Sequence, residues 1–363
     1  MHRAGPYPVR RVRVGACGPH TDGTTPSARY HATALAPTHS AQGATPDATP
    51  KTRVPPTPPL VSAPCETIRS PRPPQRDRAG ENGKNRRMVT AVTLNTGYSI
   101  PQLGLGTYKM SPEEARRSVA YALSLGYRHI DTAQMYHNEE GVGAGIKDSG
   151  VPRKDIFLTT KLDNPNHAPE RVRETFAESL EKLGTDYVDL FLIHWPLLTG
   201  DFVDSWKVME ELVARGQIRS IGVSNFEPHH LAELAAASST VPAVNQIEIH
   251  PYFHNSAAVE ATEAAGAVVE AWSPLARGLV LDDAVLTPLA AAHGVTVSQL
   301  VLAWHMAKGY VVFPKSTHEE RIKENFAAAN VTLNAEEITA IDALDKGEAG
   351  RTGMHPDTMQ RRH

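Results

Sequence analysis

From residue 88 onward, short apolar runs rich in β-branched residues alternate with longer segments of helical periodicity. This alternation is typical of consecutive strand–helix units that build a parallel sheet. We expect eight strands, at residues 103–107, 127–131, 156–161, 188–194, 220–225, 243–248, 268–273 and 310–315. Eight units without a long interruption predict a closed (β/α)8 barrel, or TIM barrel.

Local signals predict how the barrel begins and where several helices start. The segment "VTLNTGYSIP" predicts an N-terminal β-hairpin with its turn at residues 95–97, and an extra C-terminal helix is expected at about 335–344. Capping boxes and first-turn prolines mark helix starts. They are the pairs Ser111 with Glu114 and Thr296 with Gln299, and the prolines Pro112 and Pro169.

The first 87 residues differ chemically from the rest of the chain. They hold 15 of the 28 prolines and carry a net charge of +9, which leaves −12 for residues 88–363 within the overall −3. Without a sustained apolar period such a segment cannot build a core, so we predict a disordered Pro/Arg-rich extension at 1–87 and one barrel domain at 88–363. Two alternatives stay open: translation that starts at Met88, and an Arg-rich organellar transit peptide.

Composition also excludes several classes of function. Cys17 and Cys65 both precede the predicted barrel, which therefore has neither a disulfide nor a Cys-based metal site and suits the reducing cytoplasm. The barrel is acidic, and no stretch reaches the length of a membrane span, so we expect neither a nucleic-acid partner nor a membrane. We also expect no metal, because His229 and His230 are adjacent and no HExxH motif occurs.

Most of the predicted strands end in a polar or ionisable residue. In a parallel barrel the carboxyl ends of the strands converge on one face, where barrel enzymes place their active sites. One polar residue after a strand means little, but a full series in chain order predicts a site. The series is Asp131, Lys161, His194, Ser224, Asn225, Gln246, Ser273 and Lys315.

Several motifs resemble the aldo-keto reductase family over residues 93–359. They are "GYRHIDTAQMY", "LTTKL", "LIHWP", "GVSNF", "VNQIEIHPY", "EAWSPL" and "VFPKS" followed by "R..EN". The closing pattern "GR" to "HPD" at 350–357 resembles the bacterial branch that includes the 2,5-diketo-D-gluconate reductases. The resemblance implies NADPH-dependent reduction of a small aldehyde or ketone by a protein that is commonly a monomer.

By this resemblance the catalytic tetrad is Asp131, Tyr136, Lys161 and His194. Hydride delivery builds negative charge on the carbonyl oxygen, and a proton donor must quench it. The resemblance assigns that role to Tyr136, with Lys161 to stabilise the phenolate, Asp131 to keep Lys161 charged and His194 to orient the substrate carbonyl. Each member alone has a simpler explanation: Asp131 as a helix cap, Tyr136 as a loop aromatic and His194 as a core histidine.

The sequence leaves two other function classes open. A lysine at a barrel strand end can form a Schiff base, so Lys161 would also suit a lyase. A catalytically weak, reductase-like module could bind NADPH without turnover. The lyase interpretation leaves Tyr136, His194 and the cofactor motifs unexplained, and the complete tetrad argues against a silent module.

The sequence carries no Rossmann fingerprint, and "GVGAG" at 141–145 lies in a helical stretch where close helix packing explains it better. The resemblance instead lays the cofactor across the strand ends. By the resemblance Ser224, Asn225 and Gln246 bind the nicotinamide amide group, and Trp272 stacks on the nicotinamide ring. Further cofactor-binding candidates at the strand ends are Thr107, Tyr108, Ser273, Pro274 and Leu275. Candidates for the phosphates and adenine, at a helix expected to start near Glu319, are Lys315, Ser316, Thr317, Arg321, Glu324 and Asn325.

The substrate is the least predictable part, because substrate choice lies in loops. Tyr108 and Trp195 are candidate pocket walls, whereas Trp206 has the helical spacing of a core residue. Asp163 replaces the aromatic residue found in many relatives after "KL". It either faces the pocket, where it would repel anionic substrates, or turns outward and forms an Asx-turn with Asn164-Pro165. Aldehydes, 2-oxoaldehydes, keto acids and keto sugars all remain admissible.

Overall fold

The computed structural model describes residues 89–360, so the extension predicted for residues 1–87 lies outside the described residues and stays a prediction. Ala91–Thr93 (β1) pairs antiparallel with Ser99–Pro101 (β2), which confirms the hairpin. Eight further strands form one sheet in which neighbours in sequence are neighbours in space. They are β3 (Leu105–Gly106), β4 (His129–Asp131), β5 (Phe157–Leu162), β6 (Val188–Ile193), β7 (Ile218–Ser224), β8 (Val244–Glu248), β9 (Val268–Trp272) and β10 (Val311–Val312).

The sheet closes into the predicted barrel. All its strand pairs are parallel, and bridges from Leu103 to Val312 and from Gly106 to Lys315 join the first strand region to the last. Strand β10 covers two residues of the predicted 310–315. Pro314 has no N–H to extend the ladder, although its carbonyl still accepts from the Gly106 N–H.

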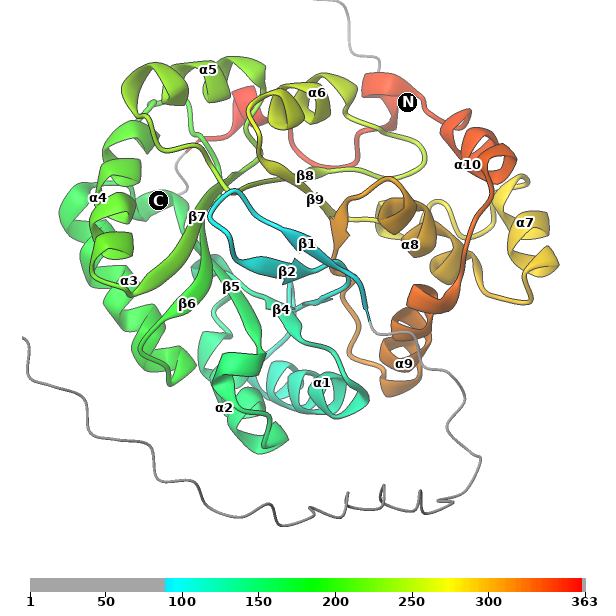
Figure 1. The fold of residues 1–363 in the computed structure, drawn as a ribbon, viewed down its shortest axis with the longest axis horizontal. Coiled ribbons are helices and arrows are strands. Elements are labelled where there is room, and N and C mark those ends of the chain that lie inside the picture. Colours follow the sequence, from blue (N-terminus) through cyan, green and yellow to red (C-terminus); the bar gives the residue numbers. More distant parts are fainter. Residues whose placement is uncertain (1–88, 361–363) are drawn as a thin grey trace, which may run out of the picture. The chain divides into compact units, whose positions relative to one another are not determined.

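Ten helices surround the barrel among the described residues (Figure 1). They are α1 (Pro112–Leu125), α2 (Glu139–Ser149), α3 (Pro169–Leu183), α4 (Phe202–Ala214), α5 (Pro228–Ala237), α6 (Ser256–Ala264), α7 (Leu286–Ala292), α8 (Val297–Ala307), α9 (Glu319–Ala327) and α10 (Ala335–Asp342). Both predicted capping boxes are present, and both prolines open their helices. Strands β5 and β6 are buried throughout, as expected of a sheet covered on its outer face by helices.

The glycine run at 141–145 packs helix α2 against its neighbours, as predicted. A Cβ atom on Gly141 would come within 2.0 Å of the Pro112 carbonyl oxygen, and one on Gly145 within 2.6 Å of that of Arg116. The glycines therefore allow α1 and α2 to approach closely, and Trp206 is likewise a core residue with 1% exposure.

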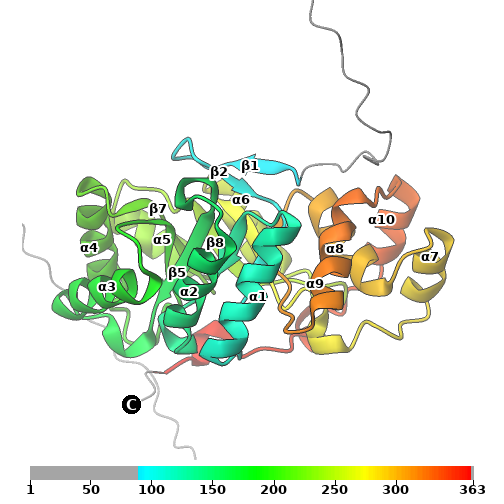
Figure 2. The same cartoon turned by 90° about the horizontal axis from the view of Figure 1, so that it is seen from below.

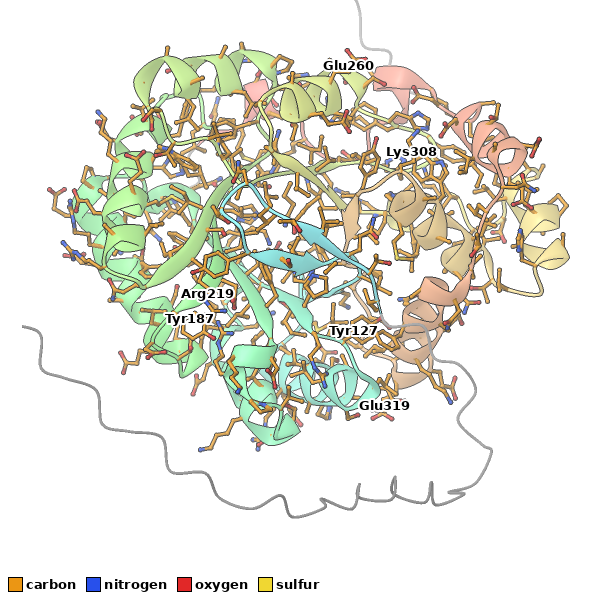
Figure 3. The ribbon with its side chains drawn as sticks, in the orientation of Figure 1. Tyr127, Tyr187, Arg219, Glu260, Lys308 and Glu319 are labelled. Carbon is orange, nitrogen blue, oxygen red and sulfur yellow. The ribbon has the colours of Figure 1, made fainter. Side chains whose placement is uncertain are left out.

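A charged cluster lies beside the hairpin at the amino ends of the strands. Arg219 lies over the Tyr187 ring, with its guanidinium carbon 4.2 Å from the ring centroid (Figure 3). The Arg153 guanidinium lies at the same distance from that ring, and both arginines pair with the buried Asp189. Arg219 also lies over the ring of Tyr98 in the hairpin. The hairpin covers the amino ends of the strands, and the C-terminal segment lies at the opposite end of the barrel (Figure 2). The site at the carboxyl ends is therefore free of the hairpin and lies on the side of the C-terminal segment.

Within residues 89–360, none of the helices is by itself long and apolar enough to cross a membrane. One bent pair, Leu286–Ala292 with Val297–Ala307, meets the length and composition criteria only when its two helices are taken together.

Candidate active site

The barrel brings the four tetrad residues together. Asp131 is the last residue of β4, Lys161 lies in β5 and His194 directly follows β6. Tyr136 ends a single 3-10 turn, η1 (Gln134–Tyr136), which follows β4. The Tyr136 ring packs edge-on against the His194 ring, with centroids 5.8 Å apart. Three strand ends and one loop therefore converge, as the sequence predicts.

The ammonium group of Lys161 is the centre of this cluster and is fully buried. Its Nζ atom donates to Asp131 Oδ1 at 2.6 Å and to the Thr132 carbonyl at 2.9 Å. It also lies 3.4 Å from the Tyr136 hydroxyl. All three ammonium hydrogens thus have acceptors, which is the arrangement that a buried positive charge requires.

Electrostatics fix the protonation states of the cluster. Burial acts to lower the pKa of Lys161, but Asp131 and Tyr136 outweigh it and raise that pKa, so Lys161 stays an ammonium. Burial raises the pKa of Asp131, while the Lys161 charge and hydrogen bonds from Lys161 and Gln246 act against the rise. Burial raises the pKa of Tyr136 to about 12, although Lys161 pulls it down. Tyr136 is therefore a protonated phenol at neutral pH.

His194 is neutral at physiological pH. Burial, followed by the charges of Lys161 and His167, holds the pKa of His194 well below its usual range. Its Nδ1 atom is buried and has no hydrogen-bond partner within the described part of the chain. A neutral imidazole has one N–H, so it can donate to a carbonyl oxygen without adding a second buried cation beside Lys161.

The residues predicted for the nicotinamide also meet at the strand ends. Ser224 Oγ donates to the Gln246 carbonyl at 2.8 Å, and Asn225 Nδ2 donates to the His194 carbonyl at 2.9 Å. Asn225 Oδ1 accepts from Trp272 Nε1 at 2.9 Å. Asn225 and Ser273 have positive φ angles, of 64° and 51°. These strained turns direct the chain sharply away from β7 and β9 at the site.

The residues predicted for the phosphates and adenine lie after β10. Lys315 and Arg321 are exposed and make no salt bridge within residues 89–360, while Ser316 is buried. Helix α9 begins at Glu319, as expected, and no side chain caps its N-terminus. Thr317 lies in the same turn, Asn325 is buried, and Glu324 Oε1 accepts from Thr296 Oγ1 at 2.7 Å. The segment offers free cations beside an open helix end.

The candidate substrate residues surround Tyr136. The ring of Tyr108 lies 5.1 Å from that of Tyr136 and is half exposed, and the buried Thr107 bonds the Asp131 carbonyl. Asp163 Oδ1 accepts from the N–H of the next residue, Asn164, at 2.8 Å. This bond is not the predicted Asx-turn, which needs the N–H of residue 165, and Pro165 has none. Burial raises the pKa of Asp163 above its usual value.

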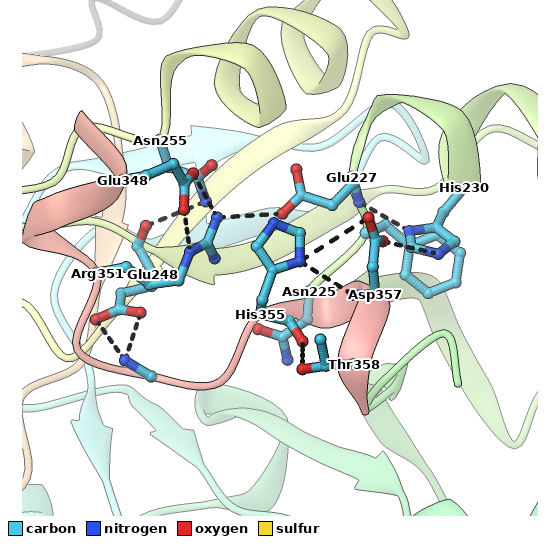
Figure 4. Close-up of polar contacts among 12 residues, drawn as sticks. Asn225, Glu227, His230, Glu248, Asn255, Glu348, Arg351, His355, Asp357 and Thr358 are labelled. Atoms are coloured by element: carbon cyan, nitrogen blue, oxygen red, sulfur yellow. Dashed lines mark hydrogen bonds and ion pairs between the residues drawn. The ribbon is translucent and has the colours of Figure 1, made fainter. Parts of the chain in front are cut away.

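Sequence reasoning missed the role of the C-terminal segment. Met359 packs with Trp195, Leu197 and Trp272, all near the site. Glu248 lies at the end of β8 (Figure 4). It holds this segment by accepting from the backbone N–H groups of Thr352 and Gly353. The motif at 350–357 was visible in the sequence, but its partner on β8 is about a hundred residues away and follows only from the fold.

The fold also brings Asp357 to the adjacent histidines. Asp357 Oδ1 lies 3.2 Å from His229 Nε2 and 3.7 Å from His230 Nε2. His230 Nδ1 accepts from the Glu227 N–H, which leaves the ring proton on Nε2, where it points to Asp357. The three ligand atoms lie within 4.8 Å of one another, but the proton on His230 Nε2 favours hydrogen bonding over metal ligation. The absence of a metal stays a prediction.

Sequence reasoning also missed Glu270, a buried carboxyl group on β9. Its side chain is fully buried and Oε2 accepts from Gln246 Nε2 at 2.8 Å. A glutamate within the apolar run "VVEAW" was the available signal, because a charged residue at an inward strand position is unusual.

Comparison with known proteins identifies the family. The model of the aldo/keto reductase family matches residues 101–346. An aldo-keto reductase of Mycolicibacterium smegmatis is 46% identical, with 75% of this chain and 98% of that protein covered. The glyoxal reductase of Bacillus subtilis is 44% identical, with 74% and 96% covered.

Solved structures agree with this identification. A variant of Gox0644 in complex with NADPH has a TM-score of 0.73 and 39% identity, with 76% of this chain and all of that chain covered. A candidate 2,5-diketo-D-gluconic acid reductase B has a TM-score of 0.71 and 35% identity, with 76% and 99% covered. The resemblance noted in the sequence is confirmed.

Proposed function

Because this chain belongs to the aldo/keto reductase family, we propose that it uses NADPH to reduce small aldehydes or ketones to alcohols, with Tyr136 as the proton donor. The observation that carries the proposal is the 3.4 Å approach of the Lys161 ammonium to the Tyr136 hydroxyl within a buried cluster. Bound NADPH supplies the hydride. Small 2-oxoaldehydes are the first substrates to test, since a relative is a glyoxal reductase.

The residues around the barrel mouth fit a nicotinamide cofactor. Gln246 directs both amide hydrogens to carboxyl groups, so its Oε1 can accept from a carboxamide. Asn225 Oδ1 would exchange its bond from Trp272 Nε1 for a bond to the cofactor. Lys315 and Arg321 would hold phosphate groups at the start of α9, which favours NADPH over NADH.

The remaining chemistry belongs to the chain itself. His194 would donate a hydrogen bond to the substrate carbonyl and orient it. As negative charge grows on that oxygen, Tyr136 would transfer its hydroxyl proton there, and the Lys161 ammonium would stabilise the phenolate left behind. Asp131 keeps Lys161 charged, since an unpaired buried ammonium would lose its proton.

The alternatives fit the site less well. A Schiff-base lyase needs a neutral Lys161 amine, whereas this amine donates to three acceptors and its pKa is raised. A cofactor-binding module without catalysis would not require all four tetrad residues, yet all four are present and in contact. Occurrence in the reducing cytoplasm and a monomeric state, expected from the sequence, remain predictions.

A steady-state screen tests the proposed function. NADPH oxidation would be followed with methylglyoxal, glyceraldehyde, diketogluconate and aromatic aldehydes as substrates. We expect turnover with at least one small carbonyl compound and little with NADH. Trapping of substrate on Lys161 by borohydride, without any oxidation of NADPH, would instead support the lyase.

A further inference from the structure

Glu270 and Gln246 are neighbours inside the barrel. They stand opposite each other in the register of β8 and β9, so their side chains leave the sheet on the same face. On the other side of Glu270, strand β10 contributes the apolar Val311. Glu270 is fully buried and Gln246 is 2% exposed.

The Gln246 amide links two carboxyl groups. Its Nε2 atom donates to Asp131 Oδ2 at 2.9 Å and to Glu270 Oε2 at 2.8 Å. Asp131 is ion-paired with Lys161, so the amide atom that faces it must be the NH₂ group. Both amide hydrogens are thereby used. Gln246 Oε1 accepts no hydrogen bond from the residues that the structure describes.

Glu270 is a neutral acid in this setting. Its Oε1 atom is buried without a hydrogen-bond partner in the described range. An ionised Glu270 would be a second buried anion beside Asp131, with only the Lys161 ammonium to compensate both. Burying an unpaired hydroxyl costs less than burying an unpaired charge. Burial and the charge of Asp131 accordingly raise the pKa of Glu270 to about 8, against opposing effects of Gln246 and Lys161.

We propose that Glu270 is a positioning residue: its neutral carboxyl group accepts one N–H of Gln246 and so turns the Gln246 amide oxygen toward the nicotinamide carboxamide. This inference rests on the proposed function, because it assumes that the cofactor binds at the strand ends. Without the Glu270 acceptor, one amide hydrogen of Gln246 loses its partner, and rotation of the amide is no longer opposed.

The same contact makes the reaction sensitive to alkaline pH. The titratable groups that act on Glu270 are Asp131 from β4 and Lys161 from β5; Gln246 and Val311 are its neutral cross-strand neighbours. Loss of the Glu270 proton adds a negative charge that opposes the effect of Lys161 on Tyr136. The phenolate becomes harder to form, so reduction should slow as pH rises through about 8.

Two variants of Glu270 separate its effect on the orientation of the Gln246 amide from its effect on the pH dependence of the reaction. Glu270→Leu removes the acceptor at similar size. Glu270→Gln keeps an acceptor oxygen but cannot ionise. Dissociation constants for NADPH would be measured by calorimetry, and kcat for methylglyoxal reduction would be followed from pH 6 to 9. Thermal melting would show that each variant folds.

We expect Glu270→Leu to weaken NADPH binding by about tenfold, as loss of one buried hydrogen bond implies. Glu270→Gln should restore most of that binding and lack the decline of kcat near pH 8 seen in the unmodified chain. In a Gln246→Ala background the Glu270→Leu change should no longer weaken NADPH binding, because the group that Glu270 orients is gone.

Three results would overturn the inference. One is unchanged NADPH binding in folded Glu270→Leu. Another is a loss of NADPH affinity on Glu270→Leu that is equally large in the unmodified chain and in the Gln246→Ala background. The third is an alkaline decline that persists in Glu270→Gln, which tests the idea even if the leucine variant does not fold. If the unmodified chain neither binds NADPH nor reduces a carbonyl compound, the proposed function fails instead.

Discussion

The Lys161 ammonium nitrogen lies 3.4 Å from the Tyr136 hydroxyl oxygen and donates to Asp131 Oδ1 at 2.6 Å. Lys161→Met, which keeps the stem and removes the charge, should reduce kcat by about 10²-fold or more. It should also destabilise the fold by about 3–5 kcal/mol, because Asp131 is left as an unpaired buried carboxylate.

The stability part of that prediction has its own control. Asp131→Asn in the Lys161→Met background removes the unpaired charge and should recover much of the lost stability, but not the activity. Chemical denaturation of the single and double variants would measure both. If Lys161→Met and the double variant are equally stable, the unpaired charge of Asp131 is not what destabilises Lys161→Met.

Arg321→Ala tests the choice of cofactor. If the exposed guanidinium clamps the 2′-phosphate, its loss should weaken NADPH binding by about 10- to 100-fold, the equivalent of about 1.5–3 kcal/mol, and leave NADH binding nearly unchanged. Lys323→Ala, an exposed cation on the same helix, is the matched control. Equal weakening of both cofactors by Arg321→Ala would contradict the assignment.

Asp163→Asn tests whether Asp163 influences substrate charge. Asparagine can still accept from the Asn164 N–H, so this local hydrogen bond should survive and only the charge changes. If the carboxylate faces substrate, kcat/KM for anionic keto acids should rise about tenfold, as relief of about 1.4 kcal/mol implies. An identical change for glyoxylate and for neutral aldehydes would limit Asp163 to shaping its loop.

Glu248 should make stability depend on pH. Burial acts to raise the pKa of Glu248, but hydrogen bonds from His250, Thr352 and Gly353 outweigh it and hold that pKa below the model-peptide value of 4.5. A lowered folded-state pKa contributes stability above pH 4.5, and that contribution is lost as pH falls through the folded-state value.

The matching variant is Glu248→Gln. Its Tm should lie below that of the unmodified chain at pH 7, and the difference should shrink as pH falls below about 4.5. A constant difference from pH 7 to pH 3.5 would mean that the charge of Glu248 does not anchor the C-terminal segment.

The barrel and tetrad could be predicted because their signals are local. Asp131 and Lys161 each stand at the carboxyl end of an apolar strand, and parallel strands bring such ends together without further information. The capping box at Ser111 is likewise complete within four residues.

Features that depend on distant partners could not be predicted. Glu270 is one inward residue in an apolar strand, and its significance comes from Gln246 and Asp131 on other strands. Glu248 is similar, since its partners Thr352 and Gly353 are fixed only by the path of the C-terminal segment. Side-chain partners across a closed barrel are set by register and shear, which the strand pattern does not specify.

Tyr136→Phe tests the central claim most directly, because phenylalanine keeps the ring packing with Tyr108 and His194 and removes only the hydroxyl group. Single-turnover reduction of methylglyoxal would be measured beside calorimetric binding of NADPH. We expect the rate to fall by about 10²–10⁴-fold, with NADPH binding essentially unchanged. Turnover within tenfold of the unmodified chain would contradict the assignment of Tyr136 as the proton donor.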